Sequence, residues 1–86
     1  MERTYEEIRG VMRALHRGDV VDLDGLSLVK DEGEIRPGDL YVAGRNTGPH
    51  LLTARVVDEE LGCIHSRDPA YSYDTHQCVK VREATN

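Results

Sequence analysis

Residues 8–30 read IRGVMRALHRGDVVDLDGLSLVK, and the spacing of their apolar residues changes near position 20. Before that point apolar residues recur every three or four positions, as they do on one face of an α-helix. After it they alternate with polar residues or run in short blocks, as they do in strands. Gly18 stands at the change, where glycine favours a helix end. The stretch therefore predicts one helix followed by β-structure.

The segment before the change has the signals of an amphipathic helix. Thr4 and Glu7 match a capping box, in which the threonine hydroxyl and the glutamate carboxylate satisfy the first free backbone N–H groups. We expect a helix over residues 4–17 that places its apolar stripe against the core. The stripe consists of Ile8, Val11, Met12 and Leu15.

A row of arginines occupies another face of this helix. Arg9, Arg13 and Arg17 stand four residues apart, so they point to the same side. One interpretation is a solvated face that the acidic residues following the helix neutralise. The other is a docking surface for an acidic protein partner.

Turn signals divide the later chain into short strands. Asp24-Gly25 favours a tight type I′ turn, and Pro37-Gly38 favours a second turn. The run Pro37-Gly38-Asp39-Leu40-Tyr41-Val42 is similar to strand-leading turns of SH3-like domains, a resemblance that concerns architecture alone. Strands are expected over residues 20–23, 26–30, 40–43, 50–58, 63–65 and 77–81.

These segments predict an α+β fold in a single domain spanning residues 1–86. An N-terminal amphipathic helix is expected to pack on a small antiparallel β-sheet or SH3-like barrel of five to six short strands. The β-rich region covers about 20–81, and residues 82–86 form a frayed tail. Because the chain is short and has no Trp or Phe, its aliphatic core is thin, which favours a homo-oligomer.

Charge and hydropathy narrow the function classes. With 16 acidic and 11 basic residues the net charge is -5, which argues against general nucleic-acid binding. No apolar stretch reaches the ~20 residues that span a bilayer, so we expect no membrane partner and a cytoplasmic location. In size and style the chain resembles short accessory proteins of phages and mobile elements, a resemblance that implies no site residues.

The segment from Gly44 to His50 is the first candidate for a binding site. Its two glycines would let backbone N–H groups converge around an anion. The side chains of Arg45, Asn46, Thr47 and His50 add donors suited to a phosphate or carboxylate. The alternative is an ordinary connection between strands whose polar residues face water.

Three tyrosines could complete such a site. Tyr71 and Tyr73 flank Ser72, so in an extended segment their rings share one face. With Tyr41 as a third wall they could cover an aromatic ring, which suggests a nucleotide-like ligand. The alternative is that a chain without Phe or Trp uses tyrosine to fill its core.

Two short motifs carry residue types that bind zinc. Cys63-Ile64-His65 and His76-Gln77-Cys78 are mirror images, and each places its two ligand types on one face of a strand. If the two strands paired, Cys63, His65, His76 and Cys78 could hold tetrahedral zinc. The usual two-residue spacing between cysteines is missing, so free thiols are favoured and a Cys63 to Cys78 disulfide is a further alternative.

No spacing in the sequence fixes a nucleophile beside a base, which argues against an enzyme. The favoured hypothesis is a non-catalytic module that binds or sequesters a small anionic, nucleotide-like ligand without a cofactor. One alternative is a protein-interaction module that uses a sheet edge or the arginine face. The other is a zinc-stapled structural domain.

Overall fold

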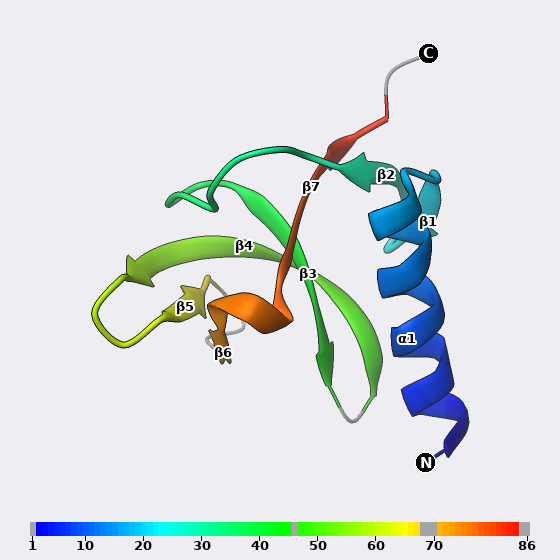
Figure 1. Cartoon of the computed structure of the whole chain (residues 1–86), viewed down its shortest axis with the longest axis horizontal. Coiled ribbons are helices and arrows are strands. Elements are labelled where there is room, and N and C mark those ends of the chain that lie inside the picture. The colour runs from blue at the N-terminus through cyan, green and yellow to red at the C-terminus, as the bar shows by residue number, and fades with distance from the viewer. Residues whose placement is uncertain (1, 46, 68–70, 85–86) are drawn as a thin grey trace.

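The computed structural model describes residues 2–45, 47–67 and 71–84. Within them one helix is followed by a single antiparallel sheet, and a short 3-10 helix precedes the last strand (Figure 1). The elements in chain order are α1 (Glu2–Arg17), β1 (Val21–Leu23), β2 (Leu26–Lys30), β3 (Leu40–Arg45), β4 (Gly48–Asp58), β5 (Cys63–Ser66), β6 (Ser72–Asp74), η1 (Thr75–Gln77) and β7 (Val79–Glu83). Neither described helix is long and apolar enough to cross a membrane.

The N-terminal helix is confirmed, although it begins before the expected cap. It starts at Glu2, so Thr4 lies inside it instead of capping it. The first residue of a helix can shift by one or two positions at little cost, so the Thr4/Glu7 pair alone does not fix where the helix begins. The expected end is correct: Gly18 N–H donates to the Leu15 carbonyl at 3.0 Å, and the next N–H donates to the Ala14 carbonyl at 2.9 Å.

The change to β-structure after the helix is also confirmed. β1 and β2 form a hairpin in which Leu23 pairs with Leu26, leaving Asp24 and Gly25 as a two-residue turn. Both turn residues have positive φ, 51° at Asp24 and 81° at Gly25. This is the backbone that a type I′ turn requires, and Asp-Gly adopts it at low cost.

The sheet is open and has more strands than expected. Its seven strands are arranged in the order β1-β2-β7-β3-β4-β5-β6, with β1 and β6 at the edges. The predicted SH3-like barrel of five to six strands is therefore wrong in both its strand number and its closure. Each edge strand has three residues and pairs on one side, so no ladder joins the two edges.

β6 was not predicted, and the last strand continues to Glu83, beyond its predicted end at Val81. Arg82 and Glu83 pair with Val29 and Leu28 of β2, and the N–H of Ala84 donates to the Ser27 carbonyl at 2.8 Å. These residues are therefore not part of a frayed tail. Their charged side chains are solvent-exposed, so apolar periodicity gave no sign that their backbone joins the ladder.

A bulge in β4 divides this long strand into two halves that pair with different strands. Its first half pairs with β3 through Thr53, and its second half pairs with β5. The register shifts between Ala54 and Val56, so the side chains after the bulge change faces. As a result Val57 packs with the buried Leu52, whereas Val56 is 41% exposed.

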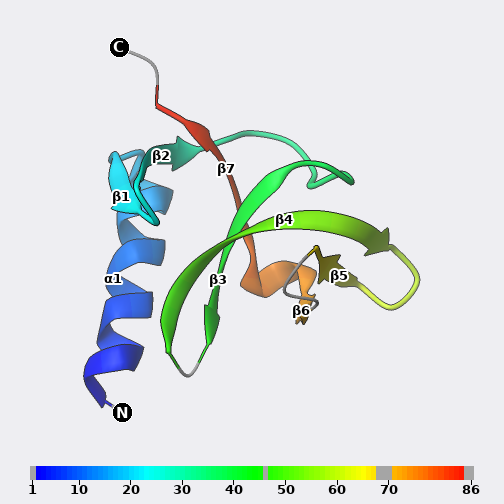
Figure 2. The same ribbon diagram turned by 180° about the vertical axis from the view of Figure 1, so that it is seen from behind.

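The two faces of β3 belong to two different cores. Val42 faces α1 and packs with buried Leu15 and Leu28 in the first core. Tyr41 and Ala43 face the other way, into a second core. That core continues with Leu52 and Ala54 of β4 and Ile64 of β5, and Figure 2 shows the β4–β6 part of the sheet curving away from the helix.

Close contact between α1 and the β3–β4 hairpin depends on a glycine. A Cβ atom placed on Gly44 would lie 2.6 Å from Cγ2 of Ile8, which no real contact permits. Ile8 is branched at Cβ and packed on the sheet, so it cannot move aside cheaply. Gly10, on the same helix, has nothing within 4 Å of an added Cβ.

We therefore expect opposite effects from two glycine-to-alanine substitutions. Gly44→Ala should lower the free energy of unfolding by about 1–3 kcal/mol, because the helix must shift to accommodate the methyl group. Gly10→Ala should raise it by about 0.5–1 kcal/mol through helix propensity. Urea denaturation of both variants measures the difference, and equal stability of the two would contradict this packing.

Candidate functional site

Arg45 does not project into a loop but lies over a tyrosine ring. It is the last residue of β3 and is half-buried on the face of the second core. Its guanidinium carbon is 3.3 Å from the centroid of the Tyr71 ring, a close cation–π stack. The stack joins the β3–β4 hairpin to the segment that leads into β6.

The three candidate tyrosines gather behind Arg45. Tyr41 and Tyr73 meet edge to face with ring centroids 6.3 Å apart, and Tyr71 and Tyr73 do so at 6.4 Å. Tyr41 is fully buried and Tyr73 packs with it in the second core. The structure thus brings Arg45 and the tyrosines together as sequence analysis suggested, but the rings pack on one another and on the guanidinium.

Two phenol groups in this cluster are buried. Each lies near a polar side chain, Ser66 beside Tyr41 and Arg45 beside Tyr73. Burial raises the pKa of Tyr41 to about 12 and also raises the pKa of Tyr73, so both groups stay protonated.

The expected anion-binding loop is a tight hairpin. Arg45 pairs with Gly48, which leaves two residues between the strands. Gly44 is part of β3, so the two glycines do not form a backbone nest. At the tip, Thr47 Oγ1 and His50 Nε2 share a 2.6 Å hydrogen bond, whereas Arg45 turns to Tyr71. Asn46 lies outside the described residues.

The four candidate zinc ligands do not assemble. β5 pairs with β6, so Cys63 stands opposite Asp74 instead of Cys78. His65 Nδ1 is hydrogen-bonded to Ser72 Oγ at 2.7 Å, and His76 lies in η1. The described residues include no group of three or more ligands that could hold a metal ion, and both cysteines are free thiols.

The arginine face of α1 is exposed. Arg17 pairs with Asp19 at 2.9 Å, which is the expected neutralisation by the acidic residues after the helix. Arg9 lies over the exposed ring of Tyr5, with 5.6 Å between its guanidinium carbon and the ring centroid. Arg13 is exposed and makes no ion pair with any described residue.

The structure contains a cavity that the sequence analysis did not anticipate. Its volume is about 640 Å³, within the range of small-molecule pockets. It lies where the pairing of β2 with β7 ends at Lys30 and the chain leaves the sheet as the 31–39 loop. Its apolar lining is Ile35, Val57, Cys78 and Val79, and its polar lining is His16, Lys30, Asp31, Glu34, Glu59, Thr75 and Lys80.

The cavity is continuous with the second core. Ile35, Val57 and Cys78 pack against the buried residues of that core and also line the cavity. The second core is therefore closed at the Arg45 end by the cation–π stack and open at the other end.

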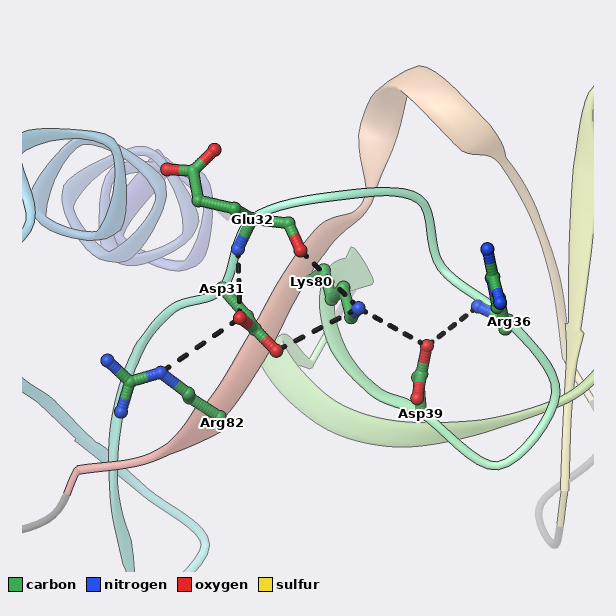
Figure 3. Close-up of polar contacts among 6 residues, drawn as sticks. All are labelled: Asp31, Glu32, Arg36, Asp39, Lys80 and Arg82. Atoms are coloured by element: carbon green, nitrogen blue, oxygen red, sulfur yellow. Dashed lines mark hydrogen bonds and ion pairs between the residues drawn. The ribbon is translucent and has the colours of Figure 1, made fainter.

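Lys80 fixes the loop that forms the cavity wall (Figure 3). Its ammonium group lies 3.5 Å from an Asp39 carboxylate oxygen and 3.8 Å from one of Asp31, and it donates to the Glu32 carbonyl at 3.4 Å. The two aspartates bracket the loop, and Asp39 also accepts from the Arg36 N–H at 2.8 Å. The ammonium therefore ties both ends of the loop to β7.

One sequence signal could have pointed to this cavity. Ile35 is a lone apolar residue within the polar 31–39 loop, and such a residue usually packs on something. The buried residues it packs against come from β3, β4 and β5, which are remote in sequence.

Comparison of the chain with protein families, curated proteins and solved structures gives no match.

The thiol of Cys78 should react slowly in the folded protein. Burial, aided by the nearby Asp74 carboxylate, raises the pKa of this thiol to about 12, so little reactive thiolate exists at pH 8. In a Cys63→Ser variant, where Cys78 is the single thiol, we expect iodoacetamide alkylation to be at least about tenfold slower than in the same chain unfolded by urea. Equal rates would contradict the buried environment.

Removal of the Lys80 charge should loosen the loop. Lys80→Met removes the cation that Asp31 and Asp39 share and should cost about 1 kcal/mol of unfolding free energy. Arg82→Met is the control, because Arg82 is more exposed and reaches Asp31 only at 4.0 Å. Urea denaturation at low and high NaCl should show a loss for Lys80→Met that shrinks as salt screens the carboxylates. Wild-type stability of this variant at low salt would contradict the role of Lys80.

Proposed function

We propose that the protein is a non-catalytic binding module that holds a small ligand in the cavity beside the 31–39 loop. The observation that carries this proposal is a cavity of about 640 Å³ whose apolar floor is the open end of the second core. Small-molecule sites are typically concave and apolar with a few polar groups placed to orient the ligand. Lys30, Lys80 and Glu59 provide such groups here.

Two features of the cavity support a role in ligand binding: its exposed apolar surface and its fixed wall. Val57 and Cys78 are only half-buried, so apolar surface is left exposed in a concave region. The wall formed by the 31–39 loop is held by the Lys80 ion pairs, which preorganises it. A preorganised site loses less entropy on binding, so a ligand of modest size can bind measurably.

The β3–β4 hairpin, with Arg45, Thr47 and His50, is a less favoured site for the ligand, which would there be nucleotide-like. One face of the Arg45 guanidinium lies on Tyr71, and His50 is occupied by Thr47, so fewer groups are free for a phosphate. An adenosine monophosphate titration that shifts the signals of Arg45 and His50, and leaves those of Val57 and Cys78 unmoved, would move the site to the hairpin.

The protein-interaction alternative has its own supporting observation. Arg13 is exposed and has no ion-pair partner among the described residues, while Arg9 lies beside exposed Tyr5. An exposed aromatic and basic helix face suits an acidic partner. Loss of a co-purifying protein in an Arg9→Glu, Arg13→Glu double variant, with no small molecule bound, would favour this alternative.

A fragment titration tests the cavity directly. We expect some members of a panel of small anionic, cationic, zwitterionic and neutral fragments to shift the amide signals of Val57, Cys78 and Lys80 in ¹⁵N–¹H spectra. Ile35→Trp should abolish these shifts by filling the cavity, because Ile35 lines it. Leu61→Trp is the control, because Leu61 is 73% exposed and does not line the cavity.

The same fragments should slow the alkylation of Cys78, which gives a second readout if Ile35→Trp folds poorly. A panel that shifts no cavity signal and protects no thiol would overturn the proposed function.

A further inference from the structure

Charged residues of both signs line the cavity. At one end stand Lys30, the last residue of β2, and His16 in the last turn of α1. At the other end stands Glu59, in the turn that follows β4. Figures 1 and 2 show the end of α1 and β2 on one side of β7, and the β4–β5 turn on the opposite side.

The charges at the two ends are not neutralised within the fold. In the described part of the chain, neither Lys30 nor Glu59 belongs to an ion pair. Lys80 and Asp31, which also line the cavity, are already paired with each other. Among the described residues, the unpaired charges left to meet a ligand are therefore the Lys30 cation at one end, the Glu59 carboxylate at the other, and the Glu34 carboxylate in the 31–39 loop.

The middle of the cavity is apolar. Its apolar lining includes Val79 on β7, Cys78 just before β7, and Val57 on β4. A ligand that runs from one end to the other would place its own apolar part on these side chains. Burial of that part is worth about 25 cal/mol for each Å² removed from water.

We infer that the cavity binds an elongated zwitterion, with a carboxylate at Lys30, an ammonium group at Glu59 and an apolar body between them. This inference rests on the proposed function and names its ligand class. A dianion such as a phosphate monoester would lie near the carboxylates of Glu34 and Glu59, which disfavours it. A simple amine would leave Lys30 unpaired, and a simple acid would leave Glu59 unpaired.

Three probes with the same alkyl body test the charge pattern. They are 8-aminooctanoate, octanoate and octylamine, which share an eight-carbon chain and differ in the charged groups at its ends. NMR titration of the full chain should give 8-aminooctanoate an affinity at least about threefold higher than that of either singly charged probe, the gain of one partly exposed ion pair. The advantage should shrink at high NaCl, because salt screens both contacts.

Two substitutions test the two ends of the cavity separately. Glu59→Gln should weaken 8-aminooctanoate and octylamine by about threefold and leave octanoate unchanged. Lys30→Gln should weaken 8-aminooctanoate and octanoate and leave octylamine unchanged. Glu60→Gln is the matched control, since this exposed neighbour of Glu59 does not line the cavity and should change none of the three affinities.

The outcomes distinguish this inference from the proposed function. Equal binding of the three probes in the cavity, or affinities that Glu59→Gln and Lys30→Gln do not change, would overturn the zwitterion and leave the binding module standing. Failure of 8-aminooctanoate to shift the cavity signals, while other fragments of the panel do so, would also overturn the zwitterion alone. Failure of every compound, with no protection of Cys78, would overturn both.

Discussion

Burial of both faces of β3 is the constraint on which the structure depends. Tyr41, Val42 and Ala43 are consecutive and fully buried, so each side of this strand needs its own cover. The helix covers the Val42 side. The Tyr41 side is covered by the sheet itself, because the bulge in β4 turns its second half and carries β5 and β6 over the second core. A small chain with few aromatic residues thus builds two thin cores around one strand.

The second core determines where the protein can bind something. Its far end is closed by Arg45, whose cation–π contact with Tyr71 ties the β3–β4 hairpin to the segment before β6. Its near end opens beside β7, because β2 stops pairing at Lys30 and the 31–39 loop leaves the sheet there. Lys80 ties both ends of that loop to β7 through Asp31 and Asp39. Lys30, the 31–39 loop and Lys80 therefore form part of the cavity and supply several of its charges.

Local patterns in the sequence predict the helix, its end at Gly18 and the Asp24-Gly25 turn, because each of these features depends on neighbouring residues. Apolar alternation located six of the strands but could not show the bulge after Ala54, which puts Val57 instead of Val56 against the second core. It also did not predict β6 or the pairing of Arg82 and Glu83, because these segments contain few apolar side chains. The tyrosine cluster was expected from side-chain chemistry, whereas the cavity depends on contacts between the 31–39 loop, β4 and β7. Such long-range contacts produce no periodic pattern of apolar residues in the sequence.

A crystal structure with the tightest-binding fragment tests the central claim most directly. The account places the fragment against Val57 and Cys78, beneath a 31–39 loop still tied to Lys80, with its charged groups toward Lys30 and Glu59. A structure in which the loop collapses so that Ile35 fills this space, and the fragment lies elsewhere on the chain, would contradict it.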